Sequence, residues 1–120
     1  MTPMIRSKAT FRKSRTNQYV VGLRYENRLE YLAQVKKGDE LKLVRELNNA
    51  FDPYAMAVYT SVDQKLGYIP SSKAFILSTL ADEGWEFRCY AVHVYSAPRH
   101  PNRRLMVFIP PPSRVPNVTA

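Results

Sequence analysis

The sequence predicts a mainly β fold, a small antiparallel barrel of six strands, closed or partly closed, with one or two short helices. Six short runs rich in β-branched and aromatic residues are separated by turn-forming residues, whereas only one segment has clear helical spacing. The 120 residues, of which 45% are hydrophobic, are enough for one domain with a modest core. No internal repeat or shift in composition indicates a second domain.

The chain begins with a basic stretch, residues 1–17, whose lack of periodicity predicts a flexible arm. Residues 18–25 predict the first strand, because β-branched and aromatic side chains favour an extended backbone. Asn27 and Glu30 have the spacing of a capping box, so a short helix is expected between them and Gly38.

The middle of the sequence predicts three strands. Alternation over residues 40–47 predicts the first of them, and one face of this strand would carry its leucines, Leu41, Leu43 and Leu47. Residues 55–61 and 65–69 predict the other two, joined by a polar turn at residues 63–65. Together the last two strands would form a hairpin.

The clearest helical pattern follows Pro70, where apolar residues recur at helical spacing. Ser71 or Ser72 is expected to cap this helix, because a serine hydroxyl can accept a hydrogen bond from a free backbone N–H of the first turn. Gly84 is expected to end it in the left-handed conformation.

Residues 86–95 predict a long strand. Its alternation places Cys89 and His93 on the same face as core-type residues, so both are expected to pack in the interior. A basic turn at residues 97–102 would lead to the last strand, residues 104–109.

The barrel domain is therefore expected to span residues 18–109, followed by a tail over residues 110–120. This tail begins with three prolines, which have no N–H group to continue a β ladder. We expect it to be extended and exposed.

The net charge of +8 is concentrated at the two ends of the chain. Residues 1–16 hold five basic side chains and residues 97–120 hold four, and neither stretch contains an acid. The segment between them is close to neutral. Basic ends on a neutral body are typical of proteins that bind nucleic acid, although solubility or another anionic partner would account for the same pattern.

Several classes of protein do not fit the sequence. A lone cysteine cannot form an internal disulfide, no apolar run reaches the roughly 20 residues of a membrane span, and no signal peptide is evident. A cytoplasmic location is therefore expected.

The four glycines are too scattered for a phosphate-binding loop, and no histidines, cysteines or paired acids have the spacing of a metal site. We expect no cofactor, no metal and no enzymatic activity.

Residues 48–58 form the most distinctive stretch, a turn between two predicted strands. The proline after Asp52 holds that residue in an extended conformation, and asparagine and aspartate side chains bond readily to nearby backbone. An aromatic ring, Phe51, and a carboxylate, Asp52, would thus lie side by side. The carboxylate could cap the turn, or it could accept a hydrogen bond from a ligand hydroxyl while repelling a phosphate.

These residues together resemble a HIRAN domain. The resemblance covers roughly residues 19–95 and is carried by four runs in the right order and spacing, VVGLRY (20–25), LVRE (43–46), NAFDPYAMAV (49–58) and LGYIP (66–70). It implies an OB-like barrel that binds single-stranded DNA. In the fork-remodelling helicase that carries such a domain, it captures a free 3′-hydroxyl end.

By position, the resemblance also implies roles for individual residues. Arg24 would contact a backbone phosphate, and Tyr25 and Phe51 would stack on bases. Asp52 would accept the hydrogen bond of the 3′-hydroxyl, and Tyr68 would line the same pocket.

Three positions depart from the pattern of the family. Ala50 replaces a frequent proline, and Glu26 stands where the helicase has a second tyrosine. Ser71 occupies the position of a pocket lysine, and Lys73 lies two residues further on as a candidate substitute.

The sequence thus predicts a non-enzymatic single-stranded DNA-binding module that recognises 3′ ends, accessory to DNA repair, replication or processing. A helicase or nuclease would act in trans, and neither a membrane nor a small-molecule substrate is expected. Two alternatives remain open at this stage. One is a protein-interaction adaptor that uses the Pro-rich tail and the basic ends, and the other is an RNA-binding barrel.

Overall fold

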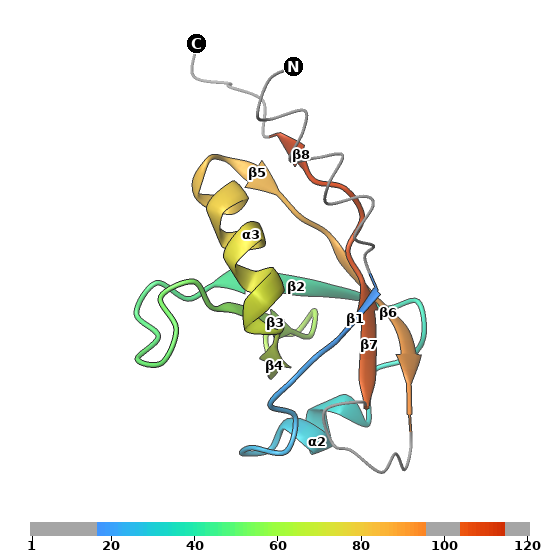
Figure 1. Cartoon of the computed structure of the whole chain (residues 1–120). Coiled ribbons are helices and arrows are strands. Elements are labelled where there is room, and N and C mark those ends of the chain that lie inside the picture. The colour runs from blue at the N-terminus through green and yellow to red at the C-terminus, as the bar shows by residue number, and fades with distance from the viewer. Residues whose placement is uncertain (1–16, 96–103, 115–120) are drawn as a thin grey trace.

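The computed structural model describes residues 17–95 and 104–114 of the chain (Figure 1). Most of the predicted basic arm and the predicted basic turn at residues 97–102 lie outside the described residues, as do residues 115–120.

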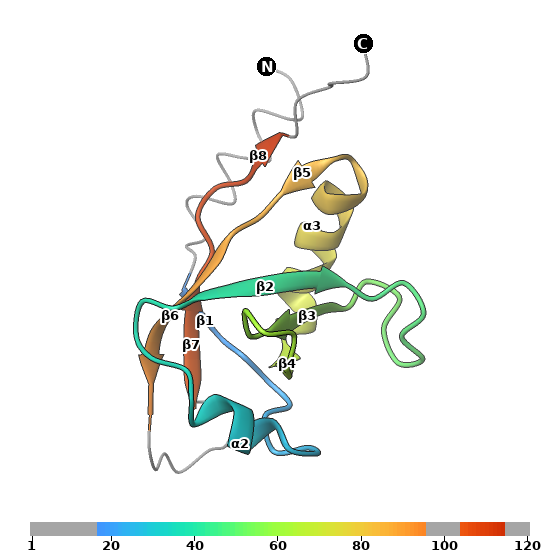
Figure 2. The same cartoon turned by 180° about the vertical axis from the view of Figure 1, so that it is seen from behind.

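The described residues form a six-stranded antiparallel sheet, a two-stranded sheet and two helices, so the predicted fold class is confirmed. The strand order in the larger sheet is β1-β7-β6-β2-β3-β4, and β5 pairs with β8. Figures 1 and 2 show α2 at one end of the curled sheet and α3 between β3 and β5. The elements are β1 (Asn17–Tyr19), α2 (Arg28–Leu32), β2 (Glu40–Arg45), β3 (Met56–Tyr59), β4 (Lys65–Tyr68), α3 (Ser71–Asp82), β5 (Trp85–Glu86), β6 (Cys89–Val94), β7 (Leu105–Phe108) and β8 (Ser113–Arg114).

A single bridge closes the larger sheet into a barrel-like shape. Val21, two residues after β1, exchanges two backbone hydrogen bonds of 2.9 Å with Tyr68 at the end of β4. β1 and β4 are the two edge strands, so this bridge brings the ends of the sheet together. The approach requires Gly67, because a Cβ atom there would lie 2.3 Å from the carbonyl oxygen of Val21.

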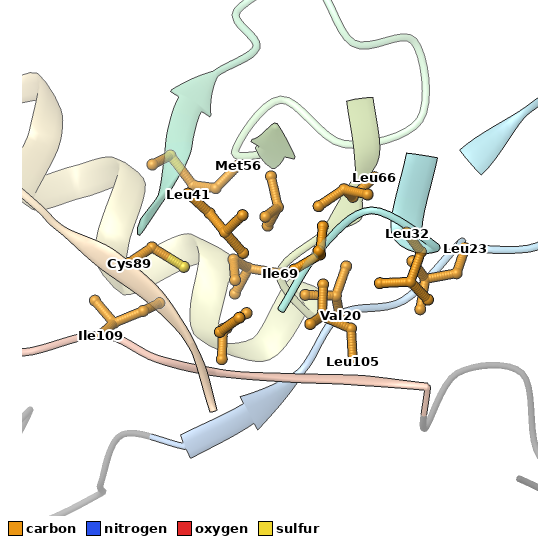
Figure 3. Close-up of a cluster of buried hydrophobic side chains, with 14 of the residues drawn as sticks. Val20, Leu23, Leu32, Leu41, Met56, Leu66, Ile69, Cys89, Leu105 and Ile109 are labelled. Carbon is orange, nitrogen blue, oxygen red and sulfur yellow. The ribbon is translucent and has the colours of Figure 1, made fainter. Parts of the chain in front are cut away.

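The core fills the space inside the curled sheet and beneath the helices (Figure 3). It contains these buried side chains: Val20, Leu23, Leu32, Val35, Leu41, Met56, Val58, Leu66, Ile69, Ala74, Leu77, Cys89, Ala91, Leu105, Val107 and Ile109. The prediction that Cys89 is buried is confirmed. Burial raises the pKa of its thiol to about 12, so the side chain is neutral and acts as a small apolar residue.

The helix ends differ in part from the predictions. α3 begins after Pro70, and neither Ser71 nor Ser72 caps it. Pro70 takes the N-cap position because its extended backbone lets its carbonyl oxygen accept the N–H of Ala74 at 2.9 Å. Gly84 has φ +96°, which confirms the left-handed residue at the end of the helix. The prediction of a capping box before α2 is wrong, since the side chain of Asn27 makes no capping hydrogen bond.

The predicted strands are also shorter than expected. The first strand ends at Tyr19, and the backbone turns soon after it at Gly22, where φ is +79°. Leu47 is 68% exposed because β2 ends before it, which corrects its assignment to the inner face with Leu41. The predicted strand at residues 86–95 is divided into β5 and β6.

His93 is exposed, so its predicted packing role is wrong. A register shift between Ala91 and His93 in the β6–β7 pairing breaks the simple alternation of the strand. A bulge of this kind turns later side chains to the other face.

The prediction that the tail is exposed is wrong in part, because Pro112 is buried and Ser113–Arg114 pairs with β5.

Candidate nucleic-acid interface

A pocket of about 720 Å³ lies where the barrel closes. Its lining comes from residues 21–28, 49–55 and 68–71, and the Val21–Tyr68 bridge joins the first of these segments to the third. Its volume falls within the range of roughly 300–1,000 Å³ typical of ligand-binding sites. The pocket is therefore large enough to hold a nucleotide-sized group.

The loop between β2 and β3 is ordered by its own side chains. Asn49 Oδ1 accepts the backbone N–H groups of Phe51, at 2.8 Å, and Asp52, at 3.0 Å. Asp52 Oδ1 in turn accepts the N–H of Tyr54 at 2.8 Å. These bonds confirm that asparagine and aspartate form the turn. They leave the ring of Phe51 98% exposed at the rim of the pocket.

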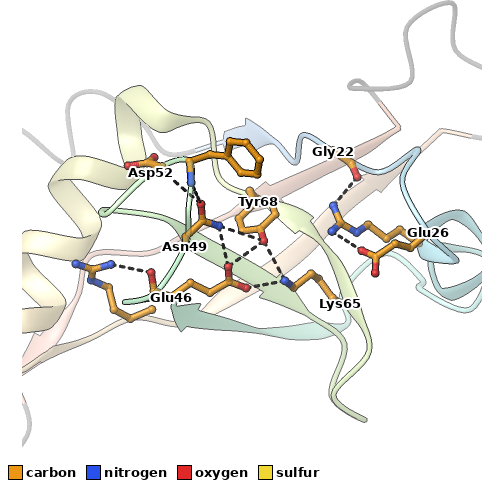
Figure 4. A network of polar contacts seen from close by, with 10 residues as sticks. Gly22, Glu26, Glu46, Asn49, Asp52, Lys65 and Tyr68 are labelled. Carbon is orange, nitrogen blue, oxygen red and sulfur yellow. Dashed lines mark hydrogen bonds and ion pairs between the residues drawn. The ribbon is translucent and has the colours of Figure 1, made fainter.

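A polar network supports this loop from below (Figure 4). The hydroxyl of Tyr68 donates to Glu46 Oε1 at 2.9 Å, and Asn49 Nδ2 donates to the same oxygen at 3.0 Å. Lys65 Nζ lies 2.7 Å from Glu46 Oε2 and donates to the Tyr68 hydroxyl at 2.9 Å. The network connects the wall of the pocket, formed by Tyr68, to the turn that presents Asp52.

Glu46 has a lowered pKa in the folded protein. Burial opposes this shift, but the hydrogen bonds from Lys65, Asn49 and Tyr68 outweigh burial and stabilise the charged carboxylate. The same network raises the pKa of Lys65 against the opposing effect of its own burial. Both groups are therefore charged at neutral pH.

We expect Glu46→Gln to destabilise the protein at neutral pH and much less in acid. The carboxylate contributes stability above the pKa of about 4.5 that it has in the unfolded chain, and this stability is lost as pH falls through the lower folded value. Thermal unfolding of wild type and variant between about pH 3 and pH 7 measures the difference. A difference in stability that stays constant over this range would contradict the assignment.

A buried arginine lies on the opposite side of the pocket. Arg28 Nη1 donates to the carbonyl oxygen of Gly22 at 2.8 Å, and Nη2 lies 2.7 Å from Glu26 Oε1. The guanidinium carbon is 5.9 Å from the ring centre of Tyr25 and 5.6 Å from that of Tyr68. Both distances suit cation–π attraction, so the cation and the two rings form one unit of the pocket wall.

Comparison with known proteins identifies the fold and its family. The sequence profile of the HIRAN domain matches residues 13–110, which is most of the chain. The chain belongs to the HIRAN domain family. A comparison with curated protein sequences finds no match.

Two solved structures resemble this HIRAN domain. A protein from Lactobacillus plantarum is 26% identical, with a TM-score of 0.69, and the match covers 79% of this chain and 89% of that one. The HIRAN domain of human HLTF is 22% identical, with a TM-score of 0.54, and the match covers 78% and 74% of the two chains. The likeness to HLTF shows that the two share a fold.

Five of the seven residues predicted for the site line the pocket of this HIRAN domain: Tyr25, Phe51, Asp52, Tyr68 and Ser71. Arg24 and Lys73 do not line it. The guanidinium of Arg24 instead lies 5.4 Å from the ring centre of Tyr25, which does line the pocket. Lys73 lies at the start of α3 and is half-buried.

Sequence reasoning missed four polar residues of this region, Glu46, Asn49, Lys65 and Arg28. Asn49 lies within the matched NAFDP run, and its capacity to order a turn was a usable signal. No local pattern joins Glu46 to Lys65 or places Arg28 between two tyrosines, because these contacts depend on how the strands pair.

Within residues 17–95 and 104–114, no three acidic, histidine or cysteine side chains are grouped as a metal site would require. No helix in these ranges is long and apolar enough to cross a membrane.

Proposed function

We propose that this HIRAN domain binds single-stranded DNA and recognises a free 3′-hydroxyl end. HIRAN domains are DNA-binding domains, which supports the general part of the proposal. The observation that carries the specific part is the pocket, where the exposed ring of Tyr25 comes together with the exposed ring of Phe51 and the carboxylate of Asp52 from a distant turn.

Asp52 is the group that would select the hydroxyl. One of its oxygens accepts the Tyr54 N–H, but a carboxylate has about four acceptor positions, so others remain for a ligand. An ionised carboxylate has no proton to donate, and its charge repels a phosphate. A 3′-hydroxyl would donate to Asp52, whereas a 3′-phosphate at the same place would bring two negative charges together.

The aromatic rings are suited to hold the terminal bases. Tyr25 is half-exposed and Phe51 is almost fully exposed, and both line the pocket. Stacking of a base on such a ring contributes about 1–3 kcal/mol and does not depend on which base it is. The module would thus read the end of the strand rather than its sequence.

The charges around the pocket would position the strand. Arg24, beside Tyr25, is exposed and can contact a backbone phosphate. The basic side chains of residues 1–16 would add attraction that is independent of sequence. On this proposal the protein serves a helicase or nuclease that processes DNA ends in trans.

Fluorescence anisotropy on a short labelled strand tests the proposal, with the 3′ end carrying either a hydroxyl or a phosphate at physiological salt. We expect the hydroxyl end to bind about tenfold more tightly or better, since hydrogen bonds to charged groups contribute about 1.5–3 kcal/mol. Equal binding of both ends would reject end recognition and leave a general single-strand binder. Lack of binding to either would favour the protein-interaction adaptor.

A further inference from the structure

Arg28 is the only basic residue among the described residues that line the pocket, which also contains the carboxylates of Glu26 and Asp52. A DNA strand with its 3′ end in this pocket brings a backbone phosphate close to the terminal nucleoside. That phosphate needs a cation nearby, because two fixed carboxylates would otherwise repel it. The position of Arg28 makes it the natural candidate.

The geometry around Arg28 holds the guanidinium ready for a ligand. The side chain is 10% exposed and is oriented by the carbonyl oxygen of Gly22 and the rings of Tyr25 and Tyr68. A Cβ atom at Gly22 would lie only 3.2 Å from Nη1, so the glycine also makes room for the cation. An arginine fixed in this way loses little side-chain entropy when it binds a phosphate.

The partners of Arg28 in the free protein are incomplete. Its Nε is buried and has no hydrogen-bond partner among the described residues. Its carboxylate partner, Glu26, has a side chain that is 72% exposed, so water can solvate this carboxylate when it leaves the guanidinium. A phosphate oxygen could therefore replace this carboxylate at small cost.

Glu26 is held beside Arg28 by an unusual backbone conformation. Its φ is +53°, in the left-handed region that residues other than glycine seldom adopt. Such conformations persist where the surrounding structure imposes them, often at ligand-binding sites. Here the turn between Gly22 and Arg28 imposes it and directs the carboxylate toward the guanidinium.

We infer that Arg28 is a phosphate-binding residue of the pocket and that Glu26 is its exchangeable counter-ion, displaced when a DNA phosphate binds. This inference rests on the proposed function in one respect, that the strand enters this pocket. It adds a second cation to the site, distinct from Arg24, and it gives Glu26 the role of weakening phosphate binding until a strand displaces it.

Glu26→Gln in the full chain tests the inference, with anisotropy of a labelled single strand bearing a 3′-hydroxyl as the measurement. Because Arg28 then lacks a counter-ion, we expect binding about fivefold tighter at low salt and a log–log salt slope steeper by about 0.7, the contribution of one neutralised phosphate. The control is Glu83→Gln, which makes the same change of net charge at the end of α3, outside the pocket lining.

A second variant tests whether the gain in affinity depends on Arg28. Adding Arg28→Lys to Glu26→Gln should remove the gain in affinity, because a compact ammonium on a shorter stem cannot make the same forked contact. If the double variant does not fold, the comparison of Glu26→Gln with Glu83→Gln tests the inference by itself. The single variant is expected to fold, because the side chain of Glu26 is exposed.

The outcomes separate this inference from end recognition. Equal effects of Glu26→Gln and Glu83→Gln would overturn the role of Arg28 and leave the ion pair as a structural contact. If wild type binds both 3′ ends equally but Glu26→Gln still tightens binding selectively, end recognition fails and the phosphate site stands. Lack of DNA binding by wild type would overturn both.

Discussion

Gly67→Ala is expected to destabilise the protein by about 3 kcal/mol or more, because a new Cβ atom cannot fit at the closure of the sheet. It would lie 2.3 Å from the carbonyl oxygen of Val21 and 2.8 Å from Val20 Cγ1. The first of these atoms belongs to the backbone of the closing bridge, so relief requires the bridge to Tyr68 to open. Denaturant unfolding of wild type and variant measures the loss.

Gly38→Ala provides a reference variant. A Cβ atom at Gly38 has no neighbour within 4 Å, but its φ of +95° makes an alanine there strained by about 1–2 kcal/mol. The control therefore measures backbone strain without a clash. If Gly67→Ala costs no more than Gly38→Ala, the two edges of the sheet are not held together as tightly as the structure shows.

The second large effect is expected at Asp52, where asparagine should abolish discrimination between 3′-hydroxyl and 3′-phosphate ends. The side-chain oxygen of asparagine can still accept the Tyr54 N–H, so the turn is retained. The negative charge that repels a phosphate is gone, and the new amide can donate to it. We expect the ratio of the two dissociation constants to fall from about ten or more to near one.

Asp39→Asn is the control for this change. Asp39 also caps a turn, with its Oδ2 accepting the N–H of Lys36 at 2.8 Å, and it does not line the pocket. Both variants alter the net charge equally, so general electrostatics cancel in the comparison. Unchanged discrimination in Asp52→Asn would show that another group recognises the end of the strand.

Much of the fold could be predicted because its signals are local. Runs of β-branched and aromatic residues indicated the strands, and helical spacing after Pro70 indicated α3. The predictions failed where an element ends or shifts register. His93 turned outward at the register shift in β6, and Leu47 lies beyond the end of β2. Neither the register shift in β6 nor the end of β2 is marked by a local sequence pattern, so alternation of apolar residues gave the wrong face for both side chains.

The candidate site was predicted in part for a similar reason. Phe51 and Asp52 are neighbours in one turn, and the order of the four matched runs brought Tyr25 and Tyr68 into the same prediction. Arg24 and Lys73 fall outside the pocket lining, since sequence position says little about the direction of a long side chain on a turn or helix.

The sequence by itself determined the strands, the main helix, the turn that presents Asp52 and the resemblance to the HIRAN family. The tertiary structure alone decided that the sheet closes at Val21 and Tyr68, and that Arg28 lies between two tyrosines with Glu26 as its partner. The physical reason is the distance along the sequence between the residues that interact. Turns and periodicity depend on residues a few positions apart, whereas the pocket depends on strand pairing between distant segments and on which charges that pairing brings into contact.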